Sequence, residues 1–398
     1  MKKTRILHIN TMDIGGGASR IAYDLNEGIN KYYGDKFEST LLVGRRKAYD
    51  SSNVIDFGIS KNEINFNGII TRLFGLDSVY SNTFSKKFTK EFIDKYDVIH
   101  LHNIHGYFFD IKLLELLKDK KVIWTFHDMW PITGHCAYSY ECEKWRLGCY
   151  NCELKNEYPK IYLDTSRKMY KMKKEIFNKL NNLTIVTPSQ WLADEVKKSF
   201  LSSKKIEVIY NGIDTSIFYE RDKISVKKKY NINNDKKIIL FLAADINDKR
   251  KGFKYLVESL NTLENKENYV LISVGSKLNH TIRLKENFEI IELGYIYDKN
   301  MLAEIYSLAD VFVNPSLSEV FGLTTVESIL CKTPVIAFNN SCNSEIIQEF
   351  GIIVDNKSVH NLKQTIELNK YLNVLIERKN IEDKYSLNKF IKSYIDIY

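Results

Sequence analysis

The chain has 398 residues, more than one ordinary hydrophobic core contains, so its length predicts two domains. Its hydrophobic content of 44% and charged content of 27% are those of a globular protein, and no stretch approaches the roughly 18 apolar residues of a membrane-spanning helix. The net charge of +8 is a mild excess that fits anionic small molecules or an anionic membrane surface as readily as nucleic acid. Because we find no nucleic-acid-binding motif, we expect no nucleic-acid partner.

The first residues, MKKTRILHIN, form a short strand pattern. They lack the long apolar stretch and the small-residue cleavage site of a signal peptide. We therefore expect the protein to be cytoplasmic.

Strand-like and helix-like segments alternate along the whole chain. In the first half, strand patterns cover residues 4–10, 38–44, 97–103, 121–128 and 183–189, and helical patterns cover 18–33 and 109–121. In the second half, strand patterns cover residues 205–211, 236–245, 269–275, 288–294, 309–316 and 333–338, with helical patterns at 253–266 and 299–309. Alternation of this kind predicts two doubly wound α/β domains, each with a parallel sheet covered by helices.

We expect the first domain to span residues 1–200 and the second to span 201–380. A final helix over 381–398 has no strand after it, and we expect it to pack back on the first domain. Two stretches do not fit the alternation. Residues 60–95 are predicted to be irregular and apolar, and residues 134–155 form a cysteine-rich insertion that precedes the basic stretch 167–174.

A glycine loop, Gly15 to Gly17, lies between the first strand and the first helix. Glycine lets the backbone approach a ligand closely, and a helix start offers free N–H groups to an anion. A plain tight turn explains the same residues equally well. The loop does not match the dinucleotide-binding fingerprint, and no acidic residue follows at the expected strand end.

Histidines follow two strands of the first half. His127 comes directly after the strand VIWTF, and His100, His102 and His105 follow the strand before it. These positions predict a polar cleft at the carboxyl edge of the sheet. A three-histidine metal site is the alternative, although no carboxylate lies at helical spacing from these residues.

Four of the six cysteines lie close together, at Cys136, Cys142, Cys149 and Cys152. The last pair has the C-x-x-C spacing of a zinc knuckle, and a cytoplasmic location disfavours disulfides. The cluster predicts a structural zinc ion. Unligated thiols and an iron–sulfur cluster remain open as alternatives.

Three consecutive cations, Lys249, Arg250 and Lys251, follow the strand at 236–245 and precede a helix. Cations at the carboxyl end of a strand suit a diphosphate. The alternative is a solvated charged loop. No Asp-x-Asp motif occurs in the chain. We therefore expect protein cations to neutralise a leaving diphosphate, with no metal cofactor in catalysis.

The segment PSLSEVFGLTTVE carries two glutamates eight positions apart, Glu319 and Glu327, with Phe321 and Gly322 between them. We expect Glu319 in a loop at the carboxyl end of a strand and Glu327 about a turn and a half into the next helix. Open parallel sheets bind ligands at this edge, and the helix start favours an anion. The two carboxylates are suited to accept hydrogen bonds from sugar hydroxyls. The alternative is a solvated loop Glu beside a surface helix Glu.

Together these residues resemble glycosyltransferase family 4, and the resemblance runs over most of the chain. The spacing of Glu319 and Glu327, the Asn-Gly-x-Asp segment that begins at Asn211, and the glycine loop at Gly15–Gly17 all match the family. The string WTFHDMWPITGHC with its spaced cysteines is similar to polysaccharide-assembly transferases of the colanic-acid type. The resemblance implies the GT-B fold: two Rossmann-like domains that face a cleft, the first for the acceptor and the second for the nucleotide sugar.

The resemblance also implies the retaining transfer of a sugar from a UDP- or GDP-linked donor to a glycan acceptor. It assigns Glu327 to the ribose, Glu319 to the donor sugar, Lys251 to the diphosphate, and His127 to the sugar or the acceptor near the reacting carbon. In place of the Arg that the family usually has directly after the strand, this chain has Ala243-Ala244-Asp245, and we expect Arg250 to take that role. The other expected donor-binding residues are Phe321, Gly322, Leu323, Gly16, Gly17 and Asn211.

Acceptors of this class are usually carried on a polyprenyl diphosphate, which predicts a peripheral contact with the inner face of the cell membrane. The apolar stretch 64–75 and the basic stretch 167–174 are the candidate surfaces. An internal subdomain and a solvated helix face explain them equally well. For the whole protein, a nucleotide-sugar epimerase of the same architecture and an inactive scaffold in a biosynthetic complex are the alternative functions.

Overall fold

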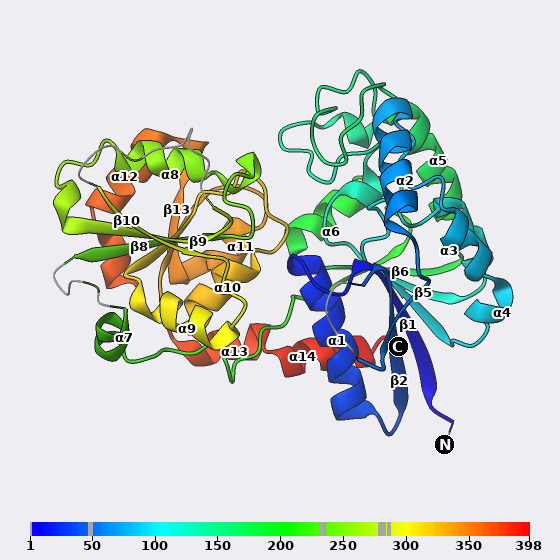
Figure 1. Cartoon of the computed structure of the whole chain (residues 1–398), viewed down its shortest axis with the longest axis horizontal. Helices are drawn as coiled ribbons and strands as arrows, with labels where there is room; N and C mark the ends of the chain where they lie inside the picture. The colour runs from blue at the N-terminus through cyan, green and yellow to red at the C-terminus, as the bar shows by residue number, and fades with distance from the viewer. Residues whose placement is uncertain (1, 47–50, 231, 233–235, 278–283, 285–287) are drawn as a thin grey trace. The chain divides into compact units, whose positions relative to one another are not determined.

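The structure is a computed structural model that describes residues 2–46, 51–230, 232, 236–277, 284 and 288–398. The chain divides into two compact units (Figure 1). Unit 1 contains residues 1–209 together with 391–398, and unit 2 contains residues 210–390. Each unit is built on one parallel sheet, which confirms the predicted architecture of two Rossmann-like domains.

The sheet of unit 1 has seven strands in the order β3-β2-β1-β4-β5-β6-β7, all paired in parallel. The strands are β1 (Thr4–Met12), β2 (Phe37–Arg45), β3 (Val54–Asp56), β4 (Val98–Leu101), β5 (Lys121–Thr125), β6 (Asn182–Thr187) and β7 (Lys205–Val208). The helices of this part are α1 (Gly17–Tyr33), α2 (Lys61–Phe74), α3 (Asn82–Lys87), α4 (Lys90–Ile93), α5 (Ser166–Asn178) and α6 (Gln190–Lys197), with 3₁₀ turns η1 (Ile111–Leu117), η2 (Trp130–Ile132) and η3 (Lys144–Arg146).

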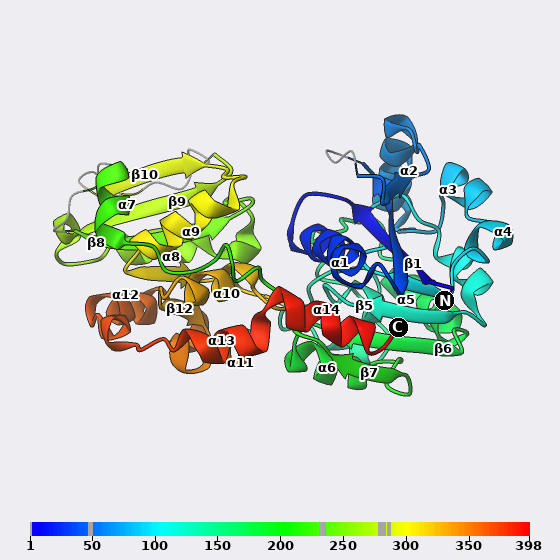
Figure 2. The same cartoon turned by 90° about the horizontal axis from the view of Figure 1, so that it is seen from below.

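Successive residues of β5 point to opposite faces of this sheet, as strand geometry requires. The ring of Trp124 packs on Phe177 of α5, with centroids 4.8 Å apart. The Oγ1 of Thr125 lies 2.7 Å from the hydroxyl of Tyr394 in α14 (Leu387–Ile395). Helices α5 and α14 therefore cover opposite faces, and the end of α14 lies beside β5 in Figure 2.

The sheet of unit 2 has six strands in the order β10-β9-β8-β11-β12-β13, also parallel. The strands are β8 (Lys237–Ala243), β9 (Tyr269–Gly275), β10 (Glu289–Gly294), β11 (Val311–Asn314), β12 (Val335–Phe338) and β13 (Gly351–Val354). The helices are α7 (Lys223–Lys229), α8 (Phe253–Leu260), α9 (Lys299–Leu308), α10 (Leu323–Leu330), α11 (Asn343–Ile347), α12 (Val359–Glu367) and α13 (Arg378–Tyr385), with 3₁₀ turns η4 (Lys249–Lys251), η5 (Lys266–Asn268), η6 (Gln348–Phe350), η7 (Asp355–Lys357) and η8 (Lys370–Asn373). In Figure 1, α8 and α12 lie on one side of this sheet and α9 and α10 on the other.

The buried core of unit 2 joins the strands to α8 and α12. Phe241 of β8, Leu256 of α8 and Ile366 of α12 belong to one hydrophobic cluster and are at most 2% exposed. This burial is the main force that holds the strands in place, because the hydrophobic effect is the dominant favourable term in folding. The carboxyl ends of β8 and β11, which are neighbours in the sheet, are thereby fixed side by side.

Several sequence predictions differ from the structure. The strand predicted at 205–211 as part of the second domain is β7, which pairs in parallel with β6 and so belongs to the first sheet; the boundary of unit 1 falls after it, at Ile209. The helix predicted over 109–121 is the 3₁₀ helix η1. The helix predicted over 381–398 is divided between α13 and α14, and residues 391–398 belong to unit 1.

The stretch 60–95, predicted to be irregular, contains three helices, α2, α3 and α4. The hydroxyl of Ser60 accepts a hydrogen bond from the backbone N–H of Glu63 and caps α2, and Gly75 ends α2 in the left-handed conformation at φ 63°. The sequence contains both signals. Among the described residues, no helix has the combination of length and apolar character that crossing a bilayer requires.

Candidate active site

The loop after β8 is tightly built. The carboxylate of Asp248 accepts the backbone N–H of Arg250 at 2.9 Å and so caps η4. Gly252 then turns the chain into α8 with φ 70°, and a Cβ at this position would lie 1.9 Å from the carbonyl oxygen of Pro315. Only glycine fits here, because both the backbone angle and the close approach exclude a side chain. The loop after β8 is thus packed directly on the loop after β11.

This packing brings Arg250 and Lys251 to Glu319, which lies in the loop after β11 as predicted. The ammonium group of Lys251 donates a hydrogen bond to Glu319 Oε1. Arg250 Nη1 lies 3.5 Å from the same oxygen and donates to the carbonyl of Ser318 at 3.2 Å. The hydroxyl of Ser316 is 3.2 Å from that carboxylate oxygen.

Glu319 is only 8% exposed, so its charge state depends on these neighbours. Burial alone would raise the pKa of Glu319, but Lys251 and then Arg250 outweigh it and hold the pKa below the usual range of a glutamate. Glu319 is therefore ionised at neutral pH beside two cations. Arg250 also pairs with Asp248, whose Oδ2 lies 3.1 Å from Nη2, so the two cations are balanced by two carboxylates. An anionic ligand would have to take over these cations from the carboxylates.

Helix α10 begins beside this cluster and confirms the predicted helix start. Gly322, at φ 78°, is its N-cap and provides no side-chain cap, and the first turn contains no acidic residue. Leu323 is the first helical residue, so its N–H is among the first-turn N–H groups of α10, which a helix leaves without intrahelical partners. The side chain of Asn314 braces this start by donating to Thr325 Oγ1 at 3.0 Å.

Two residues of the motif point into the protein interior. Glu327 lies in α10 as predicted but is 2% exposed, and Tyr306 of α9 donates its hydroxyl proton to Glu327 Oε2 at 3.0 Å. Phe321 is 4% exposed and packs against Tyr385, with centroids 5.7 Å apart. The ring of Phe321 thus anchors the loop in the core. Tyr306, which the sequence reasoning missed, is the partner of Glu327.

A pocket of about 420 Å³ opens at the carboxyl ends of β8, β9 and β10, on the edge of the sheet that holds the cation loop. Its lining includes Ile246, Ser276, Glu292 and Tyr295. This pocket was not predicted from the sequence. The available signal was a glycine at the end of each of two predicted strands, Gly275 and Gly294, which have positive φ angles of 143° and 67° in the structure.

The glycine loop of unit 1 has open space above it. Gly16 is the N-cap of α1, with φ 87° and no side-chain cap, and a Cβ built on it would meet nothing within 4 Å. Gly17 is the first residue of α1. Asn211, in unit 2, is 4% exposed, and its Oδ1 has no hydrogen-bond partner among the described residues. The donor-binding roles of these three residues stay predictions.

His127 lies just past the end of β5, as predicted, and is partly exposed. Its Nε2 is 3.0 Å from Nδ1 of His102. His105, in contrast, faces Asp128, with Nε2 2.9 Å from Oδ2. Burial lowers the pKa of His127 to about 4, with Asp128 opposing the shift, so the imidazole is neutral at neutral pH.

The basic stretch 167–174 does not form the continuous surface that the sequence predicts. Lys173 is fully buried under η2, where its ammonium group donates to the carbonyls of Trp130 at 2.7 Å and Thr133 at 3.2 Å. It also lies 3.6 Å from the centroid of the Trp130 ring. Burial lowers the pKa of Lys173 to about 7, although Asp77 opposes the shift.

The four clustered cysteines are free thiols, and Cys152 Sγ lies 3.2 Å from Nε2 of His135. Within the described part of the chain, three metal-ligating side chains come within 4.8 Å of one another only at His8, His100 and His102. The sulfurs of the cysteine segment are therefore not gathered into the tetrahedral arrangement of a closed zinc site.

Comparison with known proteins decides the family. The sequence profile of Glycosyltransferase Family 4 matches residues 15–217, more than half of the 398 residues. The chain belongs to Glycosyltransferase Family 4. This confirms the resemblance read from the sequence, and a second profile, Glycosyl transferases group 1, matches residues 222–384 of this family member.

Two curated relatives and one solved structure are similar to this family member. It is 26% identical over 268 residues to a protein named as the colanic acid biosynthesis glycosyl transferase WcaC of Escherichia coli K12, across 64% of this chain and 62% of that protein. It is 26% identical, across 64% of this chain and 72% of the relative, to N,N'-diacetylbacillosaminyl-diphospho-undecaprenol alpha-1,3-N-acetylgalactosaminyltransferase of Campylobacter jejuni. Anabaena HepE, solved in complex with UDP and glucose, has the same fold, with a TM-score of 0.69, 14% identity and 99% of both chains covered.

Proposed function

We propose that this protein is a retaining glycosyltransferase that moves a sugar from a UDP- or GDP-linked donor to a growing polysaccharide. The observation that carries the proposal is the convergence of Lys251, Arg250 and Glu319 beside the start of α10, at the carboxyl ends of β8 and β11. This is the edge at which open parallel sheets bind ligands. The colanic acid relative and the lipid-linked-sugar relative support the substrate class.

In the proposed reaction, the bond between the sugar and the diphosphate breaks through an oxocarbenium-like state. Negative charge develops on the leaving diphosphate, and Lys251, Arg250 and the N–H groups at the start of α10 stabilise it electrostatically. The acceptor hydroxyl attacks the sugar carbon and passes its proton to a leaving phosphate oxygen. Protein cations thus take the place that a metal ion has in other transferases, and no strong protein base is needed.

We propose the remaining donor contacts from the family resemblance and, for the base, from the pocket. Glu319 accepts hydrogen bonds from the sugar hydroxyls, with Lys251 shifting toward the diphosphate when the donor binds. The pocket at Ile246, Ser276 and Tyr295 has a volume of about 420 Å³ and lies on the same sheet edge, so we assign it to the nucleotide base. Glu327, held by Tyr306, is assigned to the ribose. On unit 1, we assign His127 to the reacting sugar or acceptor.

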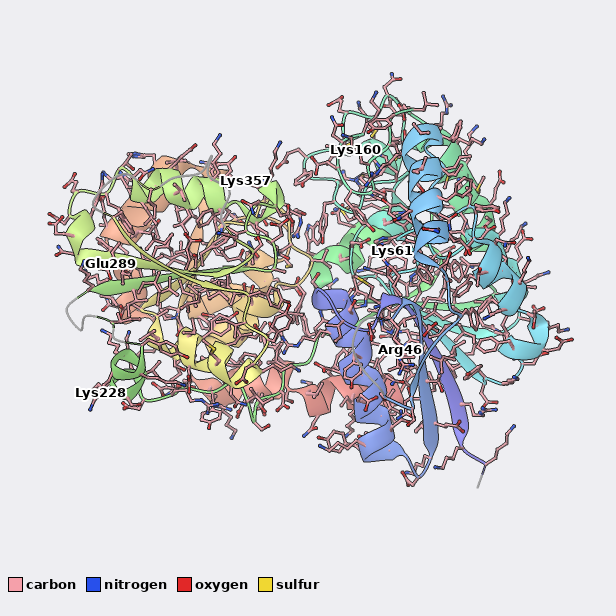
Figure 3. The ribbon with its side chains drawn as sticks, in the orientation of Figure 1. Arg46, Lys61, Lys160, Lys228, Glu289 and Lys357 are labelled. Carbon is pink, nitrogen blue, oxygen red and sulfur yellow. The ribbon has the colours of Figure 1, made fainter. Side chains whose placement is uncertain are left out.

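We also propose a lipid-linked acceptor and a peripheral membrane contact through α2. One face of α2 packs in unit 1 through residues such as Asn67 and Thr71. Its other face exposes four large apolar side chains, about half of each accessible to solvent: Phe66, Ile69, Leu73 and Phe74. Lys61 at the start of α2 and Lys160, which follows the cysteine-rich segment, are exposed cations of the same unit (Figure 3). An apolar face with nearby cations suits an anionic lipid surface.

We propose further that Cys136, Cys142, Cys149 and Cys152 hold a structural zinc ion. The C-x-x-C spacing of Cys149 and Cys152 supports this proposal. Because the four sulfurs are not gathered in this structure, zinc binding would have to rearrange the cysteine-rich segment. Metal analysis of purified protein tests the proposal. One zinc per chain, lost in a variant with all four cysteines changed to serine, is expected; a metal-free, fully folded protein would refute it.

The test of the main proposal is a thermal-shift screen of UDP- and GDP-sugars, because a ligand that binds the folded state raises the apparent Tm. The donor that binds is then incubated with and without a polyprenyl-diphosphate glycan, and the anomeric configuration of the product is read by NMR. A new glycosidic bond with retained configuration, formed also in EDTA, is expected. An epimerised nucleotide sugar without acceptor would establish the epimerase, and binding of no nucleotide sugar would favour the scaffold.

A further inference from the structure

A line of three imidazoles runs from His127 into the core of unit 1. The Nε2 of His127 is 3.0 Å from Nδ1 of His102, and Nε2 of His102 is 3.1 Å from Nδ1 of His8. The three residues come from separate parts of the sheet: His8 lies within β1, His102 just past β4, and His127 just past β5. Each link of the line therefore joins neighbouring strands across the sheet.

The inner part of the line is sealed from solvent. His8 is 0% exposed and His102 is 1% exposed. The ring of His100 stacks on His102 with centroids 4.2 Å apart. His100 stands outside the line, because its Nδ1 is 2.5 Å from the Tyr398 hydroxyl and its Nε2 is 2.8 Å from Thr125 Oγ1. Burial lowers the pKa of His8 to about 3 and the pKa of His102 well below its ordinary value, so both rings are neutral.

The surroundings of His8, at the buried end of the line, fix which nitrogen of each imidazole carries the proton. The Nε2 of His8 is buried and has no hydrogen-bond partner among the described residues. An N–H without an acceptor in the interior is rarer than a lone pair without a donor, so the proton of His8 belongs on Nδ1. His8 then donates to His102 Nε2. A neutral His102 must in turn carry its proton on Nδ1 and donate to His127 Nε2.

We propose that His8 and His102 are positioning residues that hold His127 in the neutral tautomer with its proton on Nδ1. The inference deepens the proposed glycosyl transfer, on which its functional part rests. Because Nε2 of His127 accepts the hydrogen bond of His102, Nδ1 is the nitrogen left for substrate, and it carries a proton. His127 is therefore a hydrogen-bond donor to a sugar or acceptor oxygen, and it cannot accept a proton at that nitrogen.

A metal ion on His8, His100 and His102 is the competing explanation for the same cluster. Their ligand atoms lie within 4.8 Å of one another. However, only the Nε2 of His8 lacks a partner within the part of the chain that the structure describes; the other five ring nitrogens face hydrogen-bonding atoms. A metal ion would have to replace hydrogen bonds of both His100 and His102. The line of hydrogen bonds requires no such change.

The direct test is ¹⁵N NMR of the full chain labelled at histidine, with no substrate present. We expect the signals of His127, assigned from a His127→Gln variant, to show a protonated Nδ1 and an unprotonated Nε2. The opposite tautomer in the wild-type protein would overturn the proposal, as would a stoichiometric metal ion that is still bound in the variant with all four clustered cysteines changed to serine. This NMR measurement needs neither a sugar donor nor a glycan acceptor. Its result therefore does not depend on whether the glycosyl-transfer proposal is correct.

Variants at His8 connect the tautomer to turnover. His8→Phe removes the donor to His102, and we expect the His127 tautomers to mix and kcat to fall roughly ten- to a hundredfold with little change in the KM of the donor. His8→Asn places an amide N–H near the original Nδ1 and is expected to restore both the spectrum and kcat. Tyr394→Phe removes a buried hydroxyl from the same core outside the line and is expected to change neither.

Three results at His8 would contradict the proposal: an unchanged His127 spectrum in folded His8→Phe, an unchanged kcat in that variant, or equal losses in His8→Asn and His8→Phe. If His8→Phe does not fold, the His127 tautomer in the wild-type spectrum still tests the proposal. The spectra and kcat values of His8→Asn and Tyr394→Phe, both expected to match the wild type, test it as well.

Discussion

The ammonium group of Lys251 is hydrogen-bonded to the carboxylate of Glu319, and the two residues come from loops that follow neighbouring strands, β8 and β11. Sixty-eight positions separate them in the chain. The bond exists because Gly252 lets the first loop touch the backbone of the second. In the absence of a donor, the carboxylate thus holds in place a cation that we assign to the diphosphate.

Removing that cation tests the diphosphate assignment. We expect Lys251→Ala to lower kcat/KM for the nucleotide sugar about ten- to a hundredfold, because a hydrogen bond to a charged group contributes about 1.5–3 kcal/mol. Lys249→Ala is the matched control, since Lys249 belongs to the same 3₁₀ turn but is exposed. Steady-state kinetics of both variants give the answer. Equal effects at the two positions would mean that only the general charge of the loop matters.

The hydroxyl of Tyr306 tests the role of Glu327. We expect Tyr306→Phe to raise the Kd of the donor about tenfold, because one hydrogen bond that orients the carboxylate is lost. Tyr371→Phe is the control. It removes the hydroxyl of another buried tyrosine of unit 2, which is hydrogen-bonded to Asn369, and should leave the Kd of the donor unchanged. Calorimetric titration measures both. A loss of stability in Tyr306→Phe without any change in Kd would show that Glu327 is structural.

Lys173 is expected to be essential for the stability of unit 1. Lys173→Met keeps most of the side-chain volume but removes the donors to the carbonyls of Trp130 and Thr133, and we expect a loss of about 2–3 kcal/mol in the free energy of unfolding. The neighbouring Lys174 is exposed, so Lys174→Met should change stability little. Urea unfolding followed by circular dichroism compares them, and similar midpoints for the two variants would contradict the burial of Lys173.

Acid should destabilise unit 1 through three buried imidazoles, those of His8, His100 and His102, and the partly buried imidazole of His127. Burial lowers the pKa of His8 to about 3 and of His127 to about 4, and it lowers the pKa of His100 and His102 well below the ordinary 6.5. Between pH 6.5 and about 4 the unfolded chain therefore binds protons that the folded chain does not. Stability is complete above about pH 6.5 and is lost as the pH falls toward 4.

The measurement is Tm against pH for the wild type and for His8→Asn, which lacks one of these groups. We expect the slope of the variant to be smaller between pH 6.5 and 4.5. His360→Gln removes an exposed histidine and should reproduce the wild-type slope. Parallel curves for His8→Asn and the wild type would show that His8 does not resist protonation.

Those parts of the site that depend only on the order of strands and helices along the chain could be predicted from the sequence. Glu319 follows a strand and Glu327 lies in the next helix, so the alternation of elements placed both correctly. The position of Lys251 and Glu319 at one edge of the sheet followed from the rule that parallel strands end at the same edge, whereas their hydrogen bond was not predicted. The strand at 205–211 was assigned to the wrong sheet, because periodicity identifies a strand but not its neighbour.

Other features depend on tertiary contacts that no local pattern contains. Lys173 lies in a run of cations whose pattern is typical of a solvated helix face. It is buried because it donates hydrogen bonds to the carbonyls at η2, about forty residues earlier in the chain. His8 reads as one polar residue in an apolar strand. Its relation to His102 and His127 requires the strand order β1-β4-β5, which the sequence alone does not give.

The membership of residues 391–398 in unit 1 also affects the biosynthesis of the protein. Tyr394 and Tyr398 reach Thr125 and His100 in the middle of the first sheet, yet the ribosome makes them only after the whole of unit 2. At about 5–20 residues per second, the 189 residues between Ile209 and Tyr398 take about 10–40 s to synthesise. During that time the nascent first sheet lacks part of the cover over one face, so this face is exposed to chaperones and to misassembly until translation reaches α14.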